Sequence, residues 1–348
     1  MDASKRGESR VKLLVLGGTL FLGRHLVSAA LAKGHDITIF TRGRTNPELF
    51  PGVEALRGDR DGDVSALRDG RWEAVIDTSA YLPRQVKATV DMLDGRIERY
   101  CLVSSVSVYA SFPMEPASES SATHPPLEDP AATLRPETYG PLKVACEQAV
   151  MRACGDGAFI VRPGILVGPS DPSGRLRYWT DRVSHGGEVL APGDPAHPVQ
   201  LLDARDLARW IVDRLEWSQA GIFNTAGPAN PLSMASLLDT CRAVAQSDAT
   251  FRWASDAFLL EHGVRPSADL PLWLPTDVPG TIDDDAARAL GLRHRPFAET
   301  VSDVHADDAK GVPQATGPTR PVTISRERER ELLSLLPRTA NSGSIRAS

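Results

Sequence analysis

The feature that most constrains the fold of this chain is an apolar run, Val11–Leu16, that ends in two consecutive glycines. A run of this kind is typical of a strand that is buried on both faces in a parallel sheet. From Phe21 onward the apolar residues recur at helical spacing instead, and Gly34 ends that segment. The pattern therefore predicts a buried strand, a glycine-rich turn and an amphipathic helix.

The same alternation continues along the first half of the chain. Strands are expected at DITIF, VEALRGD, AVIDTSA, RYCLVSSVSVY and AFIVRPG, and helices at DVSALRDG, PRQVKATVDML and Glu137–Cys154. Strands that alternate with helices in this way predict a doubly wound parallel sheet with right-handed crossovers. The interval Ala110–Pro136 shows no apolar period, and a loop of such length is typical of a lid or a binding loop.

The turn after the first strand, GGTLFLG, has the features of a phosphate-binding loop. Gly17 would permit the tight turn, and Gly23 would allow the helix to pack closely on the strand. The free N–H groups and the dipole at the helix N-terminus would attract a pyrophosphate. Leu20 stands where the usual spacing has another glycine, so we expect its side chain to point sideways into the fold. An ordinary tight turn without a ligand is the alternative.

After Gly164 the regular alternation ends. A helix near Leu176–His185, a helix Ala204–Trp217 and a strand at GIFNTAG are expected there, followed by helix-rich segments with many prolines. We therefore expect an α/β fold, in which a Rossmann-type doubly wound parallel sheet is joined to a smaller, non-contiguous C-terminal α/β substrate domain. The expected boundaries are 11–163 and 199–226 for the dinucleotide-binding domain, 164–198 and 227–309 for the substrate domain, and 310–348 for a linker, a charged helix and a tail.

Composition narrows the class of protein. The chain has 348 residues, of which 41% are hydrophobic and 24% charged, so it can build a large core and is not wholly disordered. A net charge of −6 at pH 7 argues against binding of a nucleic-acid backbone as its main role. The four cysteines lack CxxC or metal-ligand spacing, so we expect reduced thiols, no metal site and a cytoplasmic location. The N-terminal apolar run is too short for a signal peptide or a membrane span.

The end of the second expected strand, IFTRGR, bears on the choice of cofactor. An acidic residue there would bind the ribose 2′-hydroxyl of NAD, whereas this chain has Thr41, Arg42 and Arg44. A guanidinium suits a 2′-phosphate, so NADP is expected, with NAD as the alternative. A solvated Arg42 without a ligand is the competing interpretation. Asp59, after the third strand, is a candidate for an adenine contact.

The expected helix Glu137–Cys154 carries Tyr139 and Lys143 four residues apart, which places both side chains on one face. An ammonium beside a phenol favours the phenolate and moves the tyrosine pKa from about 10 toward working pH. The strand before this helix ends in serines, and a hydroxyl such as that of Ser105 could hydrogen-bond a substrate carbonyl or alcohol. A single serine there is often only a cap. The glycine turn, the serine and the Tyr/Lys helix, found together and in this order, indicate dinucleotide-dependent chemistry far more specifically than any one of them does alone.

Together these segments resemble the extended short-chain dehydrogenase/reductases, the NAD-dependent epimerase/dehydratase family, from about Lys12 to Phe297. SSVSVY is similar to that family's Ser-x-x-Val-Tyr segment, YGPLK to its Tyr-x-x-x-Lys and IVRPGILVGP to its Arg-x-x-x-Val-Tyr-Gly-Pro stretch. VQLLDARDLA and GIFNTAG are also similar to family segments. The resemblance assigns the catalytic roles to Ser105, Tyr139 and Lys143.

The resemblance also implies where ligands bind and how the chain assembles. The cofactor is expected to contact Gly17, Thr19, Phe21, Leu22, Gly23, Arg42, Asp59, Arg60, Thr78, Ser79, Ala80, Tyr139, Lys143 and Pro163. The substrate is expected under the Ala110–Pro136 loop and near Ser107. Arg175, Arg177 and Arg182 could bind a phosphate or carboxylate of the substrate, with solvated arginines as the alternative. The helices Pro83–Leu93 and Glu137–Cys154 are expected to form a four-helix interface in a homodimer.

Departures from the family pattern narrow the chemistry. VIDTSA has Asp77 where the usual segment has histidine, and Val106 and Ser107 follow Ser105 where sugar 4,6-dehydratases have an Asp-Glu pair. Dehydration is therefore disfavoured. We expect hydride transfer at a secondary alcohol or ketone of a sugar, a nucleotide-sugar or a similar small polar substrate. The alternatives are a non-catalytic dinucleotide-binding regulator and an RNA-binding relative, since GGTLFLG also resembles the loop of chloroplast stem-loop RNA-binding members.

Overall fold

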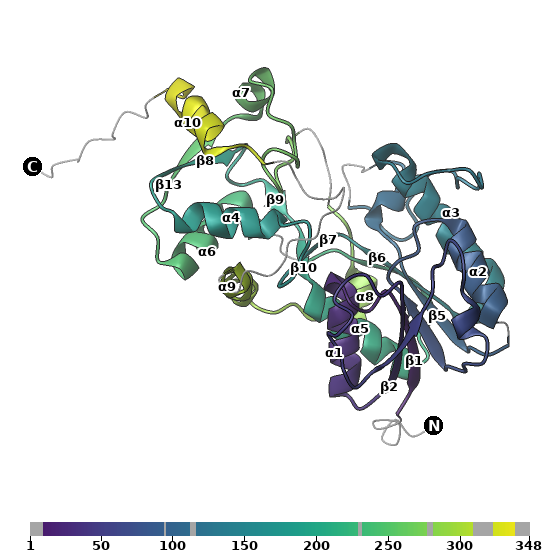
Figure 1. The fold of residues 1–348 in the computed structure, drawn as a ribbon. Helices are drawn as coiled ribbons and strands as arrows, with labels where there is room; N and C mark the ends of the chain where they lie inside the picture. The colour runs from purple at the N-terminus through teal and green to yellow at the C-terminus, as the bar shows by residue number, and fades with distance from the viewer. Residues whose placement is uncertain are drawn as a thin grey trace, which may run out of the picture. The chain divides into compact units, whose positions relative to one another are not determined.

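The computed structural model describes residues 10–93, 95–111, 116–228, 232–276, 281–308 and 323–337. The chain forms two compact units, each assembled from separate stretches of sequence (Figure 1). The first unit is drawn from residues 1–171, 200–232 and 279–303, and the second from 172–199, 233–278 and 304–348. These divisions differ from the expected boundaries, because 164–171 and 279–303 join the first unit and the C-terminal helix joins the second.

A seven-stranded parallel sheet forms the middle of the first unit, in the order β11-β6-β5-β4-β1-β2-β3. The order changes direction at β1, which lies between β4 and β2. Open sheets of this kind bind ligands beside such a switch point, at the carboxyl ends of the strands. This architecture confirms the expected Rossmann-type sheet. Its strands are β1 (Lys12–Leu16), β2 (Asp36–Thr41), β3 (Glu54–Arg57), β4 (Ala74–Asp77), β5 (Arg99–Val103), β6 (Ala158–Pro163) and β11 (Gly221–Thr225).

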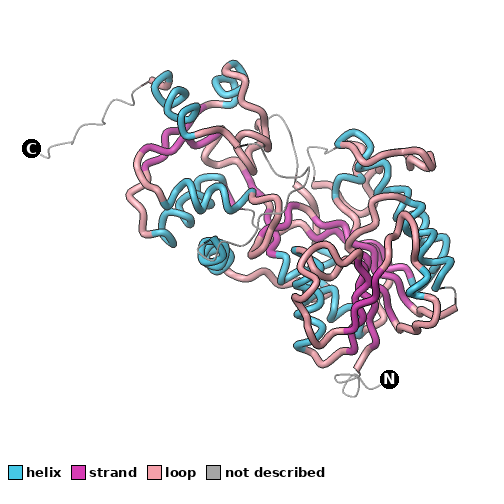
Figure 2. Tube along the Cα trace, in the orientation of Figure 1, coloured by secondary structure: helices cyan, strands magenta, loops and turns pink. Residues whose placement is uncertain are grey.

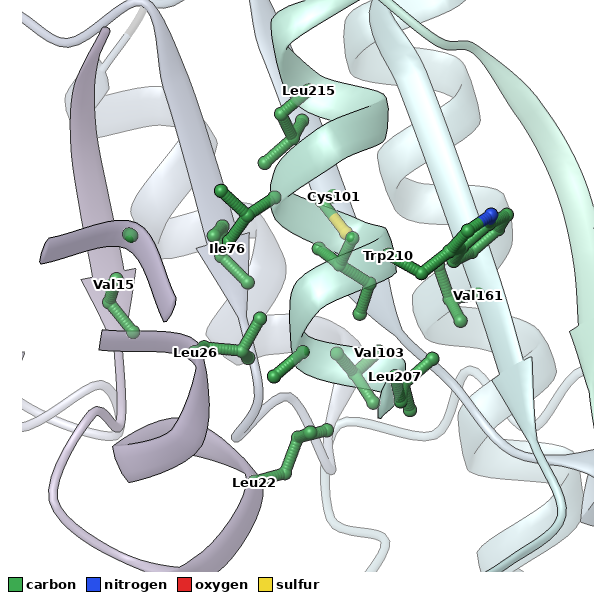
Figure 3. Close-up of a cluster of buried hydrophobic side chains, with 14 of the residues drawn as sticks. Val15, Leu22, Leu26, Ile76, Cys101, Val103, Val161, Leu207, Trp210 and Leu215 are labelled. Atoms are coloured by element: carbon green, nitrogen blue, oxygen red, sulfur yellow. The ribbon is translucent and has the colours of Figure 1, made fainter. Parts of the chain in front are cut away.

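Helices cover both faces of this sheet (Figure 2). One face is covered by α1 (Phe21–Ala32) and α5 (Ala204–Glu216), and the other by α2 (Pro83–Leu93) and α3 (Pro136–Cys154). In the first of these cores, Leu26 of α1 lies on the side of Ile76 of β4, and Trp210 of α5 lies beside Val161 of β6 (Figure 3). The strands are apolar on both sides because each side is buried under a helical layer.

The other elements of the first unit extend or return to this sheet. The short parallel pair β7 (Ile165–Val167) and β10 (Leu201–Asp203) follows β6, and α8 (Asp285–Ala289) contacts β11. The expected binding loop is anchored where it is described: Tyr109 forms a bridge with Thr123, and Ala117 forms one with Ile282. This loop is therefore tied to a segment that lies far along the chain.

The second unit contains a two-stranded parallel sheet with helices around it. The strands are β8 (Glu188–Pro192) and β13 (Thr250–Ala254), and the helices are α4 (Arg175–Ser184), α6 (Met234–Ala245), α7 (Asp256–Glu261) and α10 (Arg326–Leu335). Helix α10 is the charged helix that the sequence predicts. The chain passes between the units near β9 (Pro198–Val199) and β12 (Leu232–Ser233), and along α9 (Phe297–Asp308).

Two segments differ from their expected structure. DVSALRDG forms a single 3₁₀ turn at Ser65–Leu67, and RYCLVSSVSVY is a strand only as far as Val103, before a 3₁₀ turn at Val106–Val108. At the start of each turn a side-chain oxygen accepts a nearby backbone N–H: Asp63 Oδ1 accepts that of Ser65, and Ser105 Oγ accepts that of Ser107. Such local hydrogen bonds compete with the backbone bonds of a longer helix or strand. Residues 310–322 of the expected linker lie outside the described residues. Within the described ranges, no helix is both long and apolar enough to cross a membrane.

Candidate functional site

The turn between β1 and α1 lies at the switch point of the sheet and requires its glycines. Gly17 has a φ of +108°, and a Cβ added there would lie 2.5 Å from Thr78 Oγ1. Thr78 Oγ1 in turn donates to the carbonyl of Leu16. A Cβ on Gly23 would lie 3.0 Å from Gly18 Cα, so α1 approaches the turn more closely than another residue would allow. The backbone is therefore shaped as a dinucleotide-binding turn needs it.

Leu20 does not point into the fold, so the expectation for its side chain was wrong. It has extended backbone angles, stands immediately before α1 and is 43% exposed. Its side chain therefore lies on the surface. Helix α1 has no side-chain cap at its N-terminus. The first N–H groups of α1 are thus left for water or an anionic ligand.

Lys143 lies on α3 and reaches the carboxyl ends of two neighbouring strands. Its side chain is only 3% exposed, and its Nζ donates to the carbonyls of Ala80 at 2.7 Å and Val103 at 2.8 Å. Those carbonyls follow or end β4 and β5, which are paired in the sheet. Two of the three ammonium protons are therefore fixed, and the orientation of the third is set by the first two.

Ser105 follows β5 and precedes the turn Val106–Val108, which contacts the same helix. Its Oγ lies 3.1 Å from Ser107 Oγ and accepts the Ser107 N–H at 3.1 Å. A Cβ on Gly140 would lie 2.2 Å from the Ser107 carbonyl, so α3 packs directly against the serine segment at this glycine. Tyr139, which is half-buried, precedes Gly140. The fold thus brings the three expected catalytic residues to one edge of the sheet.

The sequence analysis missed a second tyrosine near this lysine. The Lys143 ammonium lies 5.9 Å from the centre of the Tyr81 ring, and the Tyr81 N–H is bonded to the Gln85 side chain. Burial raises the pKa of Tyr81, and the charge of Lys143 opposes that rise. The signal was its position immediately after Ala80, at the carboxyl end of β4.

Arg60 does not have a guanidinium available for a cofactor. It is buried, and it donates to Asp77 at 2.6 Å, to Thr89, to the Gln85 carbonyl and to Tyr100. Tyr100 also donates to Asp77 at 2.6 Å, and burial together with this carboxylate raises the pKa of Tyr100. The Arg60 guanidinium therefore stabilises the first unit and is corrected as a cofactor ligand, while a cofactor contact by the backbone of Arg60 stays a prediction.

The pair between Arg60 and Asp77 should contribute strongly to stability. Replacing Asp77 with Ala leaves a buried guanidinium without its carboxylate, so the free energy of unfolding is expected to fall by about 3–5 kcal/mol. Urea denaturation measures this loss. Asp91→Ala, which removes an exposed pair with Lys87, is the control and should cost about 1 kcal/mol or less. A loss for Asp77→Ala as small as that of the control would show that Arg60 needs no partner.

The remaining expected cofactor contacts lie around the same sheet edge. Thr19, Phe21 and Leu22 belong to the turn and the start of α1, Ser79 follows β4, and Pro163 ends β6. Asp59 follows β3, where its carboxylate accepts the Asp61 N–H. Arg42 follows β2 and is exposed.

Of the expected substrate residues, Ser107 lies in the first unit beside Ser105, and three arginines lie on α4 of the second unit. Arg182 is buried and donates to Glu329 on α10 and to the carbonyls of Gly186 and Glu188, so it joins α4 to α10 and β8. This role replaces the expected substrate contact. Arg177 pairs with Asp307, and Arg175 donates to Ser173.

The first unit matches a known family along most of its length. The model of the NAD dependent epimerase/dehydratase family matches residues 13–226. The chloroplast stem-loop binding protein of 41 kDa b from Arabidopsis thaliana is 25% identical over 237 residues, which are 63% of this chain and 59% of that protein. The 2′-dehydrokanamycin reductase of Streptomyces kanamyceticus is 28% identical over 240 residues, which are 66% of this chain and 65% of that protein. The matches thus span less than two thirds of each relative.

Solved structures share the fold. The UDP-glucose 4-epimerase of Thermus thermophilus, in complex with NAD, has a TM-score of 0.64 at 20% identity, over 86% of this chain and 99% of that one. The UDP-N-acetylglucosamine 4-epimerase of Bacillus cereus has a TM-score of 0.64 at 18% identity, over 89% and 99% of the two chains. The family match rests on the segment that contains the glycine turn, Ser105, Tyr139 and Lys143. The chain belongs to the NAD dependent epimerase/dehydratase family.

Proposed function

We propose that this chain is an NAD(P)-dependent oxidoreductase or epimerase that acts on a secondary alcohol or ketone of a sugar, a nucleotide-sugar or a similar small polar molecule. The observation that carries the proposal is the position of Lys143, held by two strand-end carbonyls on the helix that also presents Tyr139. Relatives named as a 2′-dehydrokanamycin reductase and a dTDP-6-deoxy-L-talose 4-dehydrogenase support this reaction class.

Each of the three residues has a distinct role in this proposal. The Tyr139 hydroxyl gives a proton to the substrate oxygen in reduction and accepts one in oxidation. The Lys143 ammonium would favour the phenolate of Tyr139 and would donate to the ribose of a bound nicotinamide cofactor. The Ser105 hydroxyl orients the substrate oxygen. A nicotinamide cofactor, when bound on the Gly17–Gly23 turn, supplies or accepts the hydride.

The test is a search for turnover with a matched inactive variant. Purified protein is incubated with nucleotide-sugars and keto-sugars in the presence of NADPH or NADH, and cofactor oxidation and epimer formation are measured. The nucleotide that is released when freshly purified protein is denatured distinguishes an epimerase from a reductase. Tightly held NAD favours an internal epimerase cycle, and an empty site favours a reductase.

NADP is the proposed cofactor because Arg42 and Arg44 follow β2. Replacing Arg42 with Ala should weaken NADP(H) binding by about 1–3 kcal/mol, the range for a lost charge-assisted contact, with little effect on NAD(H). Calorimetric titration with both cofactors measures the difference. Arg71→Ala, an exposed arginine before the amino end of β4, is the matched control. Equal losses for NADP(H) and NAD(H), or no loss, would remove Arg42 from the site.

RNA binding is a second candidate, favoured by the name of the Arabidopsis relative. The net charge of −6 and the Ser-Tyr-Lys set argue against it. An RNA binder must show affinity that falls steeply with salt, so filter binding across a salt series decides between the candidates. A dinucleotide-binding regulator would bind the cofactor but give no turnover.

We also propose a homodimer through α2 and α3, as in the family that the sequence resembles.

A further inference from the structure

We propose that Arg57, at the carboxyl end of β3, binds the adenosine 2′-phosphate of NADP(H) together with Arg42. This inference rests on the proposed function and deepens it, because it adds a specificity-determining residue that the sequence pattern did not indicate. Arg57 lies on the third strand, whereas the sequence argument considered only the residues after the second. The register of the sheet brings the ends of these two strands together, since Thr41 of β2 is paired with Arg57 of β3.

The guanidinium of Arg57 is held in place at the end of β2. Its Nη1 donates to Thr41 Oγ1 at 3.0 Å, and the Gly43 N–H donates to the same oxygen at 3.1 Å. A Cβ added to Gly43 would lie 2.7 Å from Arg57 Nη1 and 2.9 Å from its Cζ, and Gly43 has a φ of +71°. The chain after β2 thus passes close to the guanidinium, and its left-handed backbone at Gly43 favours glycine at this position. Arg57 is therefore positioned, although it is exposed.

Three arginines gather at this place. Arg42, Arg44 and Arg57 lie at the ends of two adjacent strands, and none of the three forms an ion pair with a carboxylate in the described part of the chain. Other arginines of this protein do form ion pairs with carboxylates, as Arg84 does with Asp61 and Arg252 with Glu188. A phosphate dianion would neutralise such a cluster, and a guanidinium fork matches its oxygens in two places.

The cluster lies next to the turn that would bind the pyrophosphate. The Gly17 N–H donates to the carbonyl of Phe40, near the end of β2, and the Asn46 side chain donates to the carbonyl of Thr19. In sheets of this type the adenosine ribose lies at the end of the second strand when the pyrophosphate is on the first turn. The 2′-oxygen of a bound adenosine would consequently face the segment that holds Arg57.

Two small probes separate the phosphate contact from the rest of the site. 2′,5′-ADP carries the 2′-phosphate, and 5′-AMP lacks it. Calorimetric titration of wild-type protein should show tighter binding of 2′,5′-ADP. Arg57→Ala should weaken binding of 2′,5′-ADP by about tenfold or more and change that of 5′-AMP by less than about twofold. Arg57→Lys, which keeps the charge without the fork, should recover only part of the loss.

A second variant tests the same contact without removing the charge. Gly43→Ala would press a Cβ against the guanidinium, so it should also lower the preference for 2′,5′-ADP. A preference that is unchanged in Arg57→Ala and Gly43→Ala overturns this inference alone. Equal weakening of both probes by Arg57→Ala likewise overturns it, because the residue then acts through the fold of β3. Failure of the wild-type protein to bind either probe overturns the proposed function, and this inference with it.

Discussion

Phenylalanine in place of Tyr139 is expected to lower kcat by about 10²–10⁴-fold, the contribution typical of a positioned acid or base. The substitution keeps the ring and its packing on α3 but removes the proposed proton donor. Lys143 remains, yet its ammonium is bonded to the carbonyls of Ala80 and Val103 and cannot take over the role of the hydroxyl. Cofactor affinity should stay close to that of the wild type. Steady-state kinetics and a cofactor titration on the same preparation measure both quantities.

Three further variants accompany this result. Lys143→Met should reduce both turnover and cofactor affinity, and Ser105→Ala should reduce mainly turnover. Tyr81→Phe tests whether the neighbouring tyrosine could replace Tyr139, and it should retain most of the activity. Turnover by Tyr139→Phe at the wild-type rate would mean that the chain uses the scaffold of the family with its chemistry elsewhere.

Valine in place of Gly17 is expected to abolish cofactor binding. The backbone at Gly17 has a φ of +108°, which a β-branched residue rarely adopts, and a Cβ there would lie 2.5 Å from Thr78 Oγ1. That hydroxyl is already bonded to the Leu16 carbonyl, so it cannot move away without loss of this bond. The turn must therefore change shape, and its N–H groups lose their common direction. Calorimetry with NADP(H) and NAD(H) measures the loss.

Gly52→Val is the matched control for this prediction. An added Cβ at Gly52 meets no heavy atom within 4 Å, and the residue precedes β3 at the opposite end of the strands. This variant should bind cofactor as the wild type does. A folded Gly17→Val protein with unchanged affinity for both cofactors would show that GGTLFLG is an ordinary strand–helix turn.

Local pattern was sufficient for the elements that form the sheet. PRQVKATVDML becomes a helix with the bounds Pro83–Leu93, because proline favours the first helical position and the apolar residues share one face. The glycine turn and the Tyr139–Lys143 spacing depend on neighbours within a few residues, so they too could be identified from sequence. Their meeting at one edge follows from parallel strands, whose carboxyl ends share a side of the sheet.

Contacts between distant segments could not be predicted in this way. Arg57 reaches Thr41 only through the register of β2 and β3, and Arg182 finds Glu329 at a separation of 147 residues. The family resemblance implied a cofactor contact for Arg60, whereas the buried carboxylate of Asp77 determines where its guanidinium lies. Local sequence does not distinguish an exposed arginine from a buried one. The role of each arginine therefore depends on the partner that the fold brings to it.

The two carbonyl bonds of Lys143 tie α3 to the end of β5 and to the segment after β4, in addition to the role proposed for this lysine beside Tyr139. If the proposed hydride transfer were lost in a descendant of this chain, the phenol could be lost with it at little cost to folding. The descendant could not lose the ammonium as easily, because two buried acceptors would be left without donors. Selection for foldability alone would then retain the lysine long after the chemistry had gone. Among divergent members of such a lineage, the lysine would indicate a shared fold, and the tyrosine hydroxyl would indicate whether the catalytic activity is retained.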